Sequence, residues 1–352
     1  MNSTYKDMLA QMLFVGIPNK KSIPGVISDI KKHHIGGVIL YKNNYDSLDE
    51  MIDLINKLKK ANEKYDVPLC IAIDQEGGRV NRLPKEFNNI KSASRLCKSG
   101  LKAVTKASQI SSSVLRNLGI NMNFAPVLDV RNQSDDNAFI GNRAYSNNEE
   151  EIVACAKSFI KEYNKSKVIP VCKHYPGHGC INVDSHIFLP IIKNFSKNSR
   201  DLKPFLEIGN DAPAIMVSHI LINGYTNFKP ASLSKSFIQN FIREDNNYKG
   251  LVITDELGMR AVRLLFGKYR SVKLAYEANN DIICCKYHDG YVDKVLDTLM
   301  CDLKLDINNI KDSYTKILDY KKRYILNDKP INNKVDLKEI NKEIDSINNM
   351  KE

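Results

Sequence analysis

Residues 250–259 read GLVITDELGM, and this stretch decides the fold class. An apolar run rich in Val and Ile ends in two adjacent carboxylates, Asp255 and Glu256, after which a glycine allows the chain to turn. A short run that is apolar nearly throughout is typical of a parallel strand covered on both faces. The stretch therefore predicts a buried β-strand with ionisable groups at its carboxyl end.

Eight such runs occur along the chain, separated by stretches with the apolar spacing of helices. The predicted strands are residues 12–17, 36–41, 68–74, 122–130, 168–174, 214–220, 250–255 and 281–287. Eight alternations of strand and helix predict an α/β protein with a parallel sheet, and eight strands close a (β/α)8 barrel of the TIM type. The alternative is an open doubly wound sheet, which usually has fewer strands and a GxGxxG turn after the first strand, a turn that this sequence lacks.

Two of the intervening stretches have clear amphipathic patterns. Residues 47–65 are predicted to form a helix with Ser47 as its N-cap and Glu50 completing a capping box. Residues 234–245 are predicted to form another helix, with an apolar stripe made of Phe237, Ile238, Phe241 and Ile242. The first residues of the chain are expected to form a helix that leads directly into a strand.

The 352 residues suit one large barrel, since such a domain typically needs about 250 residues. We expect a single barrel domain over residues 1–325, closing with helices near residues 291–305 and 307–324. Residues 326–352 are rich in Asn, Lys and Glu and are predicted to form a tail or a peripheral helix.

Composition excludes several classes of protein. The net charge is +11, but the basic residues form no single stripe, so no nucleic-acid partner is expected. The eight cysteines include no CxxC pair, which argues against a zinc ribbon. No stretch approaches about 18 consecutive apolar residues, so no membrane span is expected. The N-terminal apolar run lacks a cleavage site for a leader, and we therefore expect a cytoplasmic protein.

Ionisable residues recur at the ends of the predicted strands. They are Asp74, Asp129, Lys173, His174, His219 and Asp255. In a barrel, all strands deliver their carboxyl ends to one face, so these side chains are predicted to converge there. Because neighbouring strand residues point to opposite sides, only one of Asp255 and Glu256 is expected to face the pocket, and we assign Asp255 inward.

Residues 173–186, KHYPGHGCINVDSH, are predicted to form a long loop over this face. His174 and His178 have the spacing of a helical metal site, but Pro176 and the glycines argue against a helix, so no metal is expected. Asp184 and His186 can hydrogen-bond on one side of a turn, which would raise the pKa of the imidazole. A histidine held in this way can donate and accept a proton near neutral pH, although an isolated DSH could also be a simple turn.

Two further segments carry arginines. Residues 72–83, AIDQEGGRVNRL, place Asp74 at a strand end and follow it with Arg79 and Arg82, and residues 140–146, IGNRAYS, add Arg143. Aspartate and arginine can hold sugar hydroxyls through paired acceptors and donors. Taken alone, each of these arginines is more often part of a surface ion pair.

Taken together, IDQEGGRVNRL, NFAPVLDV, IGNRAYS, KHYPGHG followed by DSH, and ITDELGM resemble glycoside hydrolase family 3. The resemblance covers about residues 5–325 and is to the β-N-acetylglucosaminidase branch, whose members trim peptidoglycan fragments. DSH separates this branch from relatives such as β-glucosidases, which use a distant glutamate as acid/base. The resemblance also implies a (β/α)8 barrel.

The resemblance implies roles for individual residues. Asp255 matches the nucleophile, His186 the general acid/base, and Asp184 the dyad partner of that histidine. The residues that match those holding the N-acetylglucosamine unit are Asp74, Arg82, Arg143, Lys173 and His174. Asn142 departs from the branch, which commonly has an acidic residue there, and this leaves the details of the substrate open.

The implied reaction is exo-acting, retaining removal of terminal N-acetylglucosamine from muropeptides in cell-wall recycling, through a covalent glycosyl intermediate on Asp255. It needs no metal and no organic cofactor. The expected partner is a small saccharide or muropeptide, and the protein is expected to be a monomer or a weak homodimer. The alternatives are a β-glucosidase or β-xylosidase, a glycoside phosphorylase, and a non-catalytic peptidoglycan-binding barrel.

Overall fold

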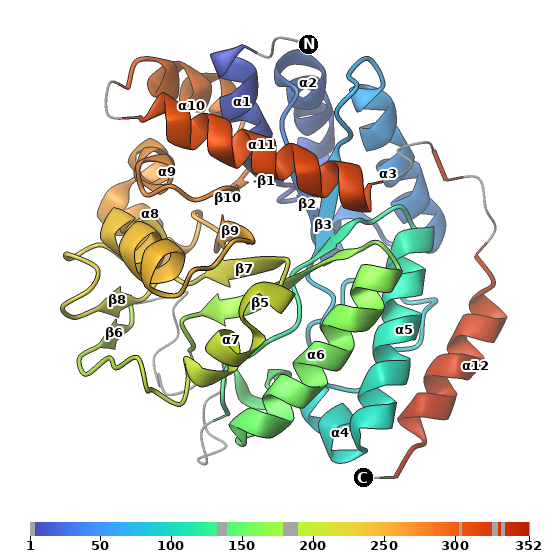
Figure 1. Cartoon of the computed structure of the whole chain (residues 1–352). Coiled ribbons are helices and arrows are strands. Elements are labelled where there is room, and N and C mark those ends of the chain that lie inside the picture. Colours follow the sequence, from blue (N-terminus) through green and yellow to red (C-terminus); the bar gives the residue numbers. More distant parts are fainter. Residues whose placement is uncertain are drawn as a thin grey trace.

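The computed structural model describes residues 4–131, 139–178, 189–302, 305–325, 330–331 and 335–351. Eight parallel strands lie side by side in the order β10-β1-β2-β3-β4-β5-β7-β9. Their bounds are β1 Leu13–Gly16, β2 Gly37–Leu40, β3 Cys70–Ile73, β4 Met122–Asn123, β5 Ile169–Tyr175, β7 Ala214–Val217, β9 Leu251–Thr254 and β10 Ile283–Lys286. A parallel bridge between Ile253 and Ile282 joins the two edges of the sheet. The predicted (β/α)8 barrel is confirmed (Figure 1).

Each predicted apolar run coincides with one barrel strand, although β5 ends one residue beyond its run, and the largest difference concerns β4. The sequence predicted a strand over residues 122–130, but regular pairing ends at Asn123. Pro126 has no N–H to donate to a neighbouring strand, which interrupts the ladder. Pairing with β5 continues irregularly, because the amide of Lys173 donates to the carbonyl of Pro126 at 3.0 Å and Val127 bridges to Lys173.

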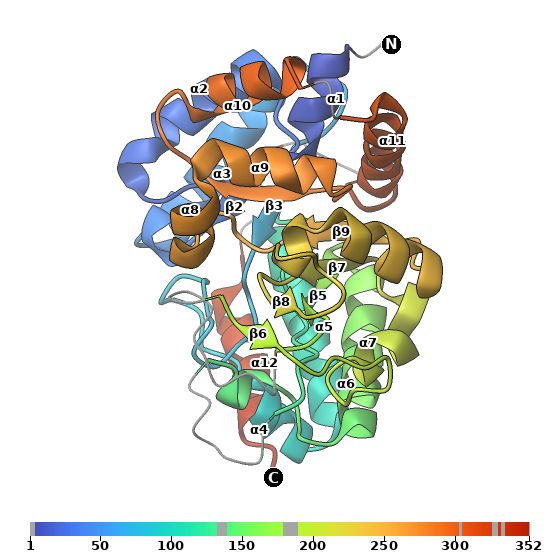
Figure 2. The same ribbon diagram turned by 90° about the vertical axis from the view of Figure 1, so that its left-hand side faces the viewer.

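Helices surround the strands on the outside of the barrel (Figures 1 and 2). They are α1 Tyr5–Met12, α2 Ile23–His33, α3 Leu48–Asn62, α4 Ala93–Lys98, α5 Leu101–Asn117, α6 Glu149–Lys165, α7 Lys203–Ile208, α8 Arg260–Phe266, α9 Lys268–Glu277, α10 Tyr291–Met300 and α11 Ile307–Tyr324. The predicted passage from helix to strand at the start of the chain is confirmed by α1 and β1. None of the helices in the described ranges is long and apolar enough to cross a membrane.

The start of α3 confirms one part of the predicted cap and corrects the other. The hydroxyl of Ser47 accepts a hydrogen bond from the amide of Glu50, as expected of an N-cap. Glu50 does not return a bond to Ser47, so the predicted capping box is wrong. The Glu50 carboxylate accepts instead from the amide of Asp46 at 3.0 Å and pairs with Lys20 at 2.6 Å, and these contacts draw it away from the cap.

The predicted helix at residues 234–245 is present as a π-helix, Ser236–Asp245. Its four predicted stripe residues, Phe237, Ile238, Phe241 and Ile242, are all buried. Two elements add to the barrel. A small parallel sheet joins β6 Ile191–Ile192 to β8 Leu221–Ile222, and α12 Leu337–Asn348 packs against α5 (Figure 1).

Candidate active site

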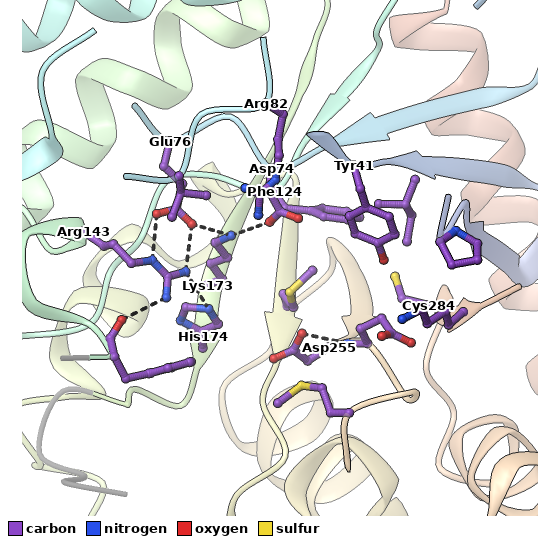
Figure 3. A pocket seen from close by; sticks show the side chains of 18 of the residues that line it. Tyr41, Asp74, Glu76, Arg82, Phe124, Arg143, Lys173, His174, Asp255 and Cys284 are labelled. Atoms are coloured by element: carbon purple, nitrogen blue, oxygen red, sulfur yellow. Dashed lines mark hydrogen bonds and ion pairs between the residues drawn. The ribbon is translucent and has the colours of Figure 1, made fainter. Parts of the chain in front are cut away.

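A cavity of about 630 Å³ opens at the carboxyl ends of the barrel strands. Its lining comes from segments far apart in the sequence, including Tyr41 after β2, Asp74 after β3, Phe124 after β4, Lys173 in β5 and Asp255 after β9 (Figure 3). This face carries the active site in barrel enzymes, because the loops there can vary without disturbing the strands.

The cavity brings together most of the residues singled out in the sequence. Its lining includes Asp74, Arg82, Arg143, Lys173, His174 and Asp255. Asp184 and His186 lie outside the described residues, which stop at residue 178 and resume at residue 189. Four of the six predicted strand-end residues, Asp74, Lys173, His174 and Asp255, therefore converge on the cavity, whereas Asp129 and His219 are not among its lining residues.

A buried ion-pair network lies on one side of the cavity and is centred on Glu76, which the sequence analysis did not select (Figure 3). Lys173 Nζ lies 2.7 Å from both Asp74 Oδ1 and Glu76 Oε1. Arg143 donates two hydrogen bonds to Glu76, from Nε at 2.9 Å and from Nη2 at 2.8 Å. Residues two apart on an extended segment point to the same side, so the i, i+2 spacing from Asp74 was the signal for Glu76.

The charges of this network decide the protonation of Glu76. Burial opposes ionisation, but the nearby Lys173 and Arg143 hold the pKa of Glu76 well below its usual value. Glu76 is thus an anion that fixes two cationic side chains in the cavity wall. Arg82 brings a further donor group, since its Nε is buried and has no hydrogen-bond partner within the described ranges.

His174 is held by a buried carboxylate. Its Nδ1 lies 2.6 Å from Asp129 Oδ2, and Asp129 Oδ1 also accepts from the backbone amide of His178 at 2.7 Å. Burial opposes the charge on Asp129, but His174 and these hydrogen bonds lower its pKa. Arg143 Nη2 lies 3.4 Å from His174 Nε2, and arginine can only donate. We therefore assign the His174 proton to Nδ1, which donates to Asp129.

Asp255 is ionised at the end of β9. Burial opposes its charge, but the neighbouring His219 and His174 and the amide of Glu256 lower its pKa. That amide donates to Asp255 Oδ1 at 2.7 Å. His219 is itself buried between the hydroxyl of Ser232, 2.6 Å from its Nδ1, and the carbonyl of Glu256, 3.1 Å from its Nε2. A carboxylate in this state has the form required of a nucleophile.

Glu256 also lines the cavity, so the expectation that only one of the two acids faces it is wrong. Strand geometry ends at Thr254, and strict alternation of sides does not extend into the turn that follows. Glu256 Oε1 accepts from the amide of Gly258 at 2.6 Å. Burial, with a smaller contribution from Asp255, raises the pKa of Glu256 to about 7. Near neutral pH, Asp255 is thus ionised whereas Glu256 is only partly ionised.

The sequence as a whole matches the model of a family described as the glycosyl hydrolase family 3 N-terminal domain, over residues 4–320. The chain belongs to glycoside hydrolase family 3. The family inferred from the motifs is thereby confirmed, and with it the barrel fold that the resemblance implied.

Two named relatives of the chain are β-hexosaminidases. One from Idiomarina loihiensis is 33% identical over 271 residues, which is 75% of this chain and 80% of the relative. The β-hexosaminidase A of Pseudoalteromonas piscicida is 33% identical over 284 residues, which is 74% of this chain but only 47% of that longer protein. A solved β-N-acetylglucosaminidase of the family from Paenibacillus superposes with a TM-score of 0.88 at 28% identity, covering 98% of this chain and 68% of its own.

Proposed function

We propose that this family 3 chain is an exo-acting, retaining β-N-acetylglucosaminidase with Asp255 as its nucleophile. The observation that carries the proposal is an ionised carboxylate at the end of β9 that lines the same cavity as Asp74, Arg143 and Lys173. The names of the relatives support N-acetylglucosamine as the sugar.

In the proposed first step, an oxygen of Asp255 attacks the anomeric carbon while the bond to the leaving oxygen breaks. His186 donates its proton to that oxygen, and a covalent glycosyl ester forms on Asp255. In the second step, His186 removes a proton from water, and the resulting attack on the anomeric carbon releases the sugar and Asp255. Asp184 keeps the imidazole in the required tautomer. The roles of residues 184 and 186 rest on the DSH motif alone.

The proposed sugar-binding wall uses the groups already described. The side chain of Asp74 is 21% exposed while Lys173 holds it, so its carboxylate can accept from sugar hydroxyls. Arg82 and Arg143 add donors, and the unprotonated Nε2 of His174 adds an acceptor. Glu76 holds Arg143 in place, and Asp129 holds His174. Such preorganised contacts favour the transition state, because no reorganisation is needed during reaction.

The nucleophile is tested with p-nitrophenyl N-acetyl-β-glucosaminide. Asp255→Asn should abolish turnover while the variant still binds N-acetylglucosamine. Glu256→Gln is the matched control, because it changes the adjacent carboxyl group to an amide in the same way. Comparable activity of Asp255→Asn and the wild type would refute the assignment. His186→Ala should impair natural disaccharides more than the aryl substrate, whose leaving group needs little protonation.

The sugar and the acceptor are tested separately. Comparing kcat/KM for the aryl N-acetylglucosaminide, glucoside and xyloside should show a preference for the first, and a preference for either other sugar contradicts the proposal. Product analysis with and without inorganic phosphate should give free sugar in both cases, whereas a sugar phosphate indicates a phosphorylase. No turnover of any of these substrates, with binding retained, would support the non-catalytic alternative.

We further propose that the natural substrate is a peptidoglycan fragment and that the protein acts in cell-wall recycling in the cytoplasm as a monomer or weak homodimer. Purified muropeptides, cell fractionation and light scattering test these three points. We also propose that residues 1–325 carry the catalytic unit and that residues 326–352 are peripheral, since the described lining of the cavity runs from Pro18 to Lys286. Activity of a chain ending at residue 325 tests this boundary.

A further inference from the structure

We propose that Asp29, His33 and Asp293 form a binding site for a divalent cation of the zinc class, which links α2 to α10. None of the three is among the residues that line the cavity, so the site is separate from the proposed catalytic centre. Within the described ranges, these residues are a group of possible metal ligands whose donor atoms all lie within 4.8 Å of one another.

The helices position the three donors. Asp29 and His33 are four residues apart on α2 and therefore share one face of that helix. Asp293 lies in the first turn of α10. His33 Nε2 and Asp293 Oδ1 are 3.0 Å apart. Two donors bound to one tetrahedral zinc ion, each about 2.0–2.1 Å from the metal, lie about 3.3 Å from each other. The His33–Asp293 pair is thus close to a ligating arrangement. The donor oxygen of Asp29 lies within 4.8 Å of both, so a short movement of its side chain would bring it to the same metal ion.

The burial of Asp29 independently favours a cation-binding site. Asp29 is 7% exposed, and its Oδ2 is buried without a hydrogen-bond partner in the described part of the chain. An ionised carboxylate oxygen in this position is costly unless a cation or a donor accompanies it.

The state of His33 also suits a metal. His33 is 7% exposed, and its Nε2 lies 3.0 Å from Asp293 Oδ1. A neutral ring nitrogen is the ligating form of histidine. One imidazole and two carboxylates provide three nitrogen and oxygen donors of the kind that zinc accepts, which leaves one position for water.

Lys32 is the competitor for this site. Its Nζ lies 2.6 Å from Asp293 Oδ1, but its side chain is 60% exposed and can swing into solvent. A divalent cation placed among the three donors would neutralise both carboxylates, whereas the lysine contacts only one of them. We therefore expect metal binding to displace Lys32 and removal of its charge to strengthen binding.

The position of the site gives it a structural role. α2 follows β1 and α10 follows β10, and these two strands are neighbours in the barrel although they come from opposite ends of the sequence. A metal that joins their helices would hold the first and last strands together. Because it binds only the folded chain, it stabilises the barrel, and the stabilisation increases with the logarithm of the metal concentration once this exceeds the Kd.

The test uses the full chain, freed of metal with a chelator, and zinc alone as the probe. Competition with a chromophoric chelator gives the affinity, and Co²⁺ gives visible bands that report nitrogen and oxygen coordination. Asp293→Asn and His33→Gln should each weaken zinc binding by at least about 100-fold and abolish the rise in Tm on adding zinc. Lys32→Gln should tighten binding.

The matched control is Asp297→Asn, which removes the same charge one turn further along α10 and should leave zinc binding unchanged. His174→Gln separates this site from any binding by the histidine of the cavity, and it too should keep the zinc-dependent rise in Tm. Hydrolysis of the aryl glycoside by Asp293→Asn should equal that of the wild type. Equal zinc affinity and stoichiometry in the wild type and in the His33→Gln, Asp293→Asn double variant would overturn the proposal.

Discussion

Replacing Glu76 with Gln tests whether one buried carboxylate holds the cationic wall of the cavity. Glu76 is 5% exposed at its side chain and contacts both Lys173 and Arg143, which are also largely buried. Removing one member of a buried ion pair typically costs about 3–5 kcal/mol, because the remaining charge loses its partner. Asp74 still compensates Lys173, so most of the loss falls on Arg143.

That free energy converts into a measurable shift in Tm. Unfolding entropy of about 2.1 cal mol⁻¹ K⁻¹ per residue, applied to 352 residues, predicts that Glu76→Gln lowers Tm by about 4–7 °C. The kcat/KM for the aryl N-acetylglucosaminide should fall as well, because Arg143 loses its orientation. Calorimetry and steady-state kinetics on the same preparation measure both effects.

The pH dependence of this variant has a definite sign. Folding lowers the pKa of Glu76, so its stabilisation is complete above the usual carboxyl pKa of about 4.3 and is lost as the pH falls towards the lowered value. The difference in Tm between the wild type and Glu76→Gln should therefore be largest at pH 7 and should become smaller at acid pH. Glu50→Gln, which breaks an exposed pair with Lys20, is the control and should show no resolvable change. A Glu76→Gln variant with unchanged Tm and unchanged kcat/KM refutes the reasoning.

Three further predictions concern other parts of the molecule. The pKa of Glu256 is raised to about 7, so ionisation of this residue destabilises the fold as the pH rises from about 4 to 7. Glu256→Gln should therefore be more stable than the wild type at pH 8, by at most about 3 kcal/mol. Parallel profiles of Tm against pH for the two proteins would contradict this prediction. Asp129→Asn removes the charge and leaves one acceptor oxygen for two donors, His174 Nδ1 and the amide of His178. It should lower kcat/KM by about 10–100-fold with the fold retained, as checked by kinetics and circular dichroism. The sulfurs of Cys97 and Cys155 lie 3.5 Å apart, so mild oxidation with diamide should join them with the loss of two titratable thiols, and a Cys97→Ser variant should lose no thiol pair at this site.

The barrel was predictable from the sequence because its signals are local. Seven of the eight strands lie within their own apolar runs and β5 extends one residue beyond its run, since a strand buried on both faces needs apolar residues at nearly every position. Parallel strands in a barrel share one carboxyl end, so Asp74, Lys173 and Asp255 could be assigned to the same face without knowledge of their distances. The shortening of β4 was not predicted, because the apolar run continues past Pro126 although the hydrogen-bond ladder does not.

The sequence by itself therefore determined the order of the elements, the family, and the face on which the ionisable groups gather. Only the tertiary structure decided which of these groups pair with one another. Glu76 meets Lys173 and Arg143, and His174 meets Asp129, across distances in sequence that no local pattern spans. The charge states of Asp255 and Glu256 were also beyond the sequence, because two neighbouring acids differ only through the burial, histidines and amides around each of them.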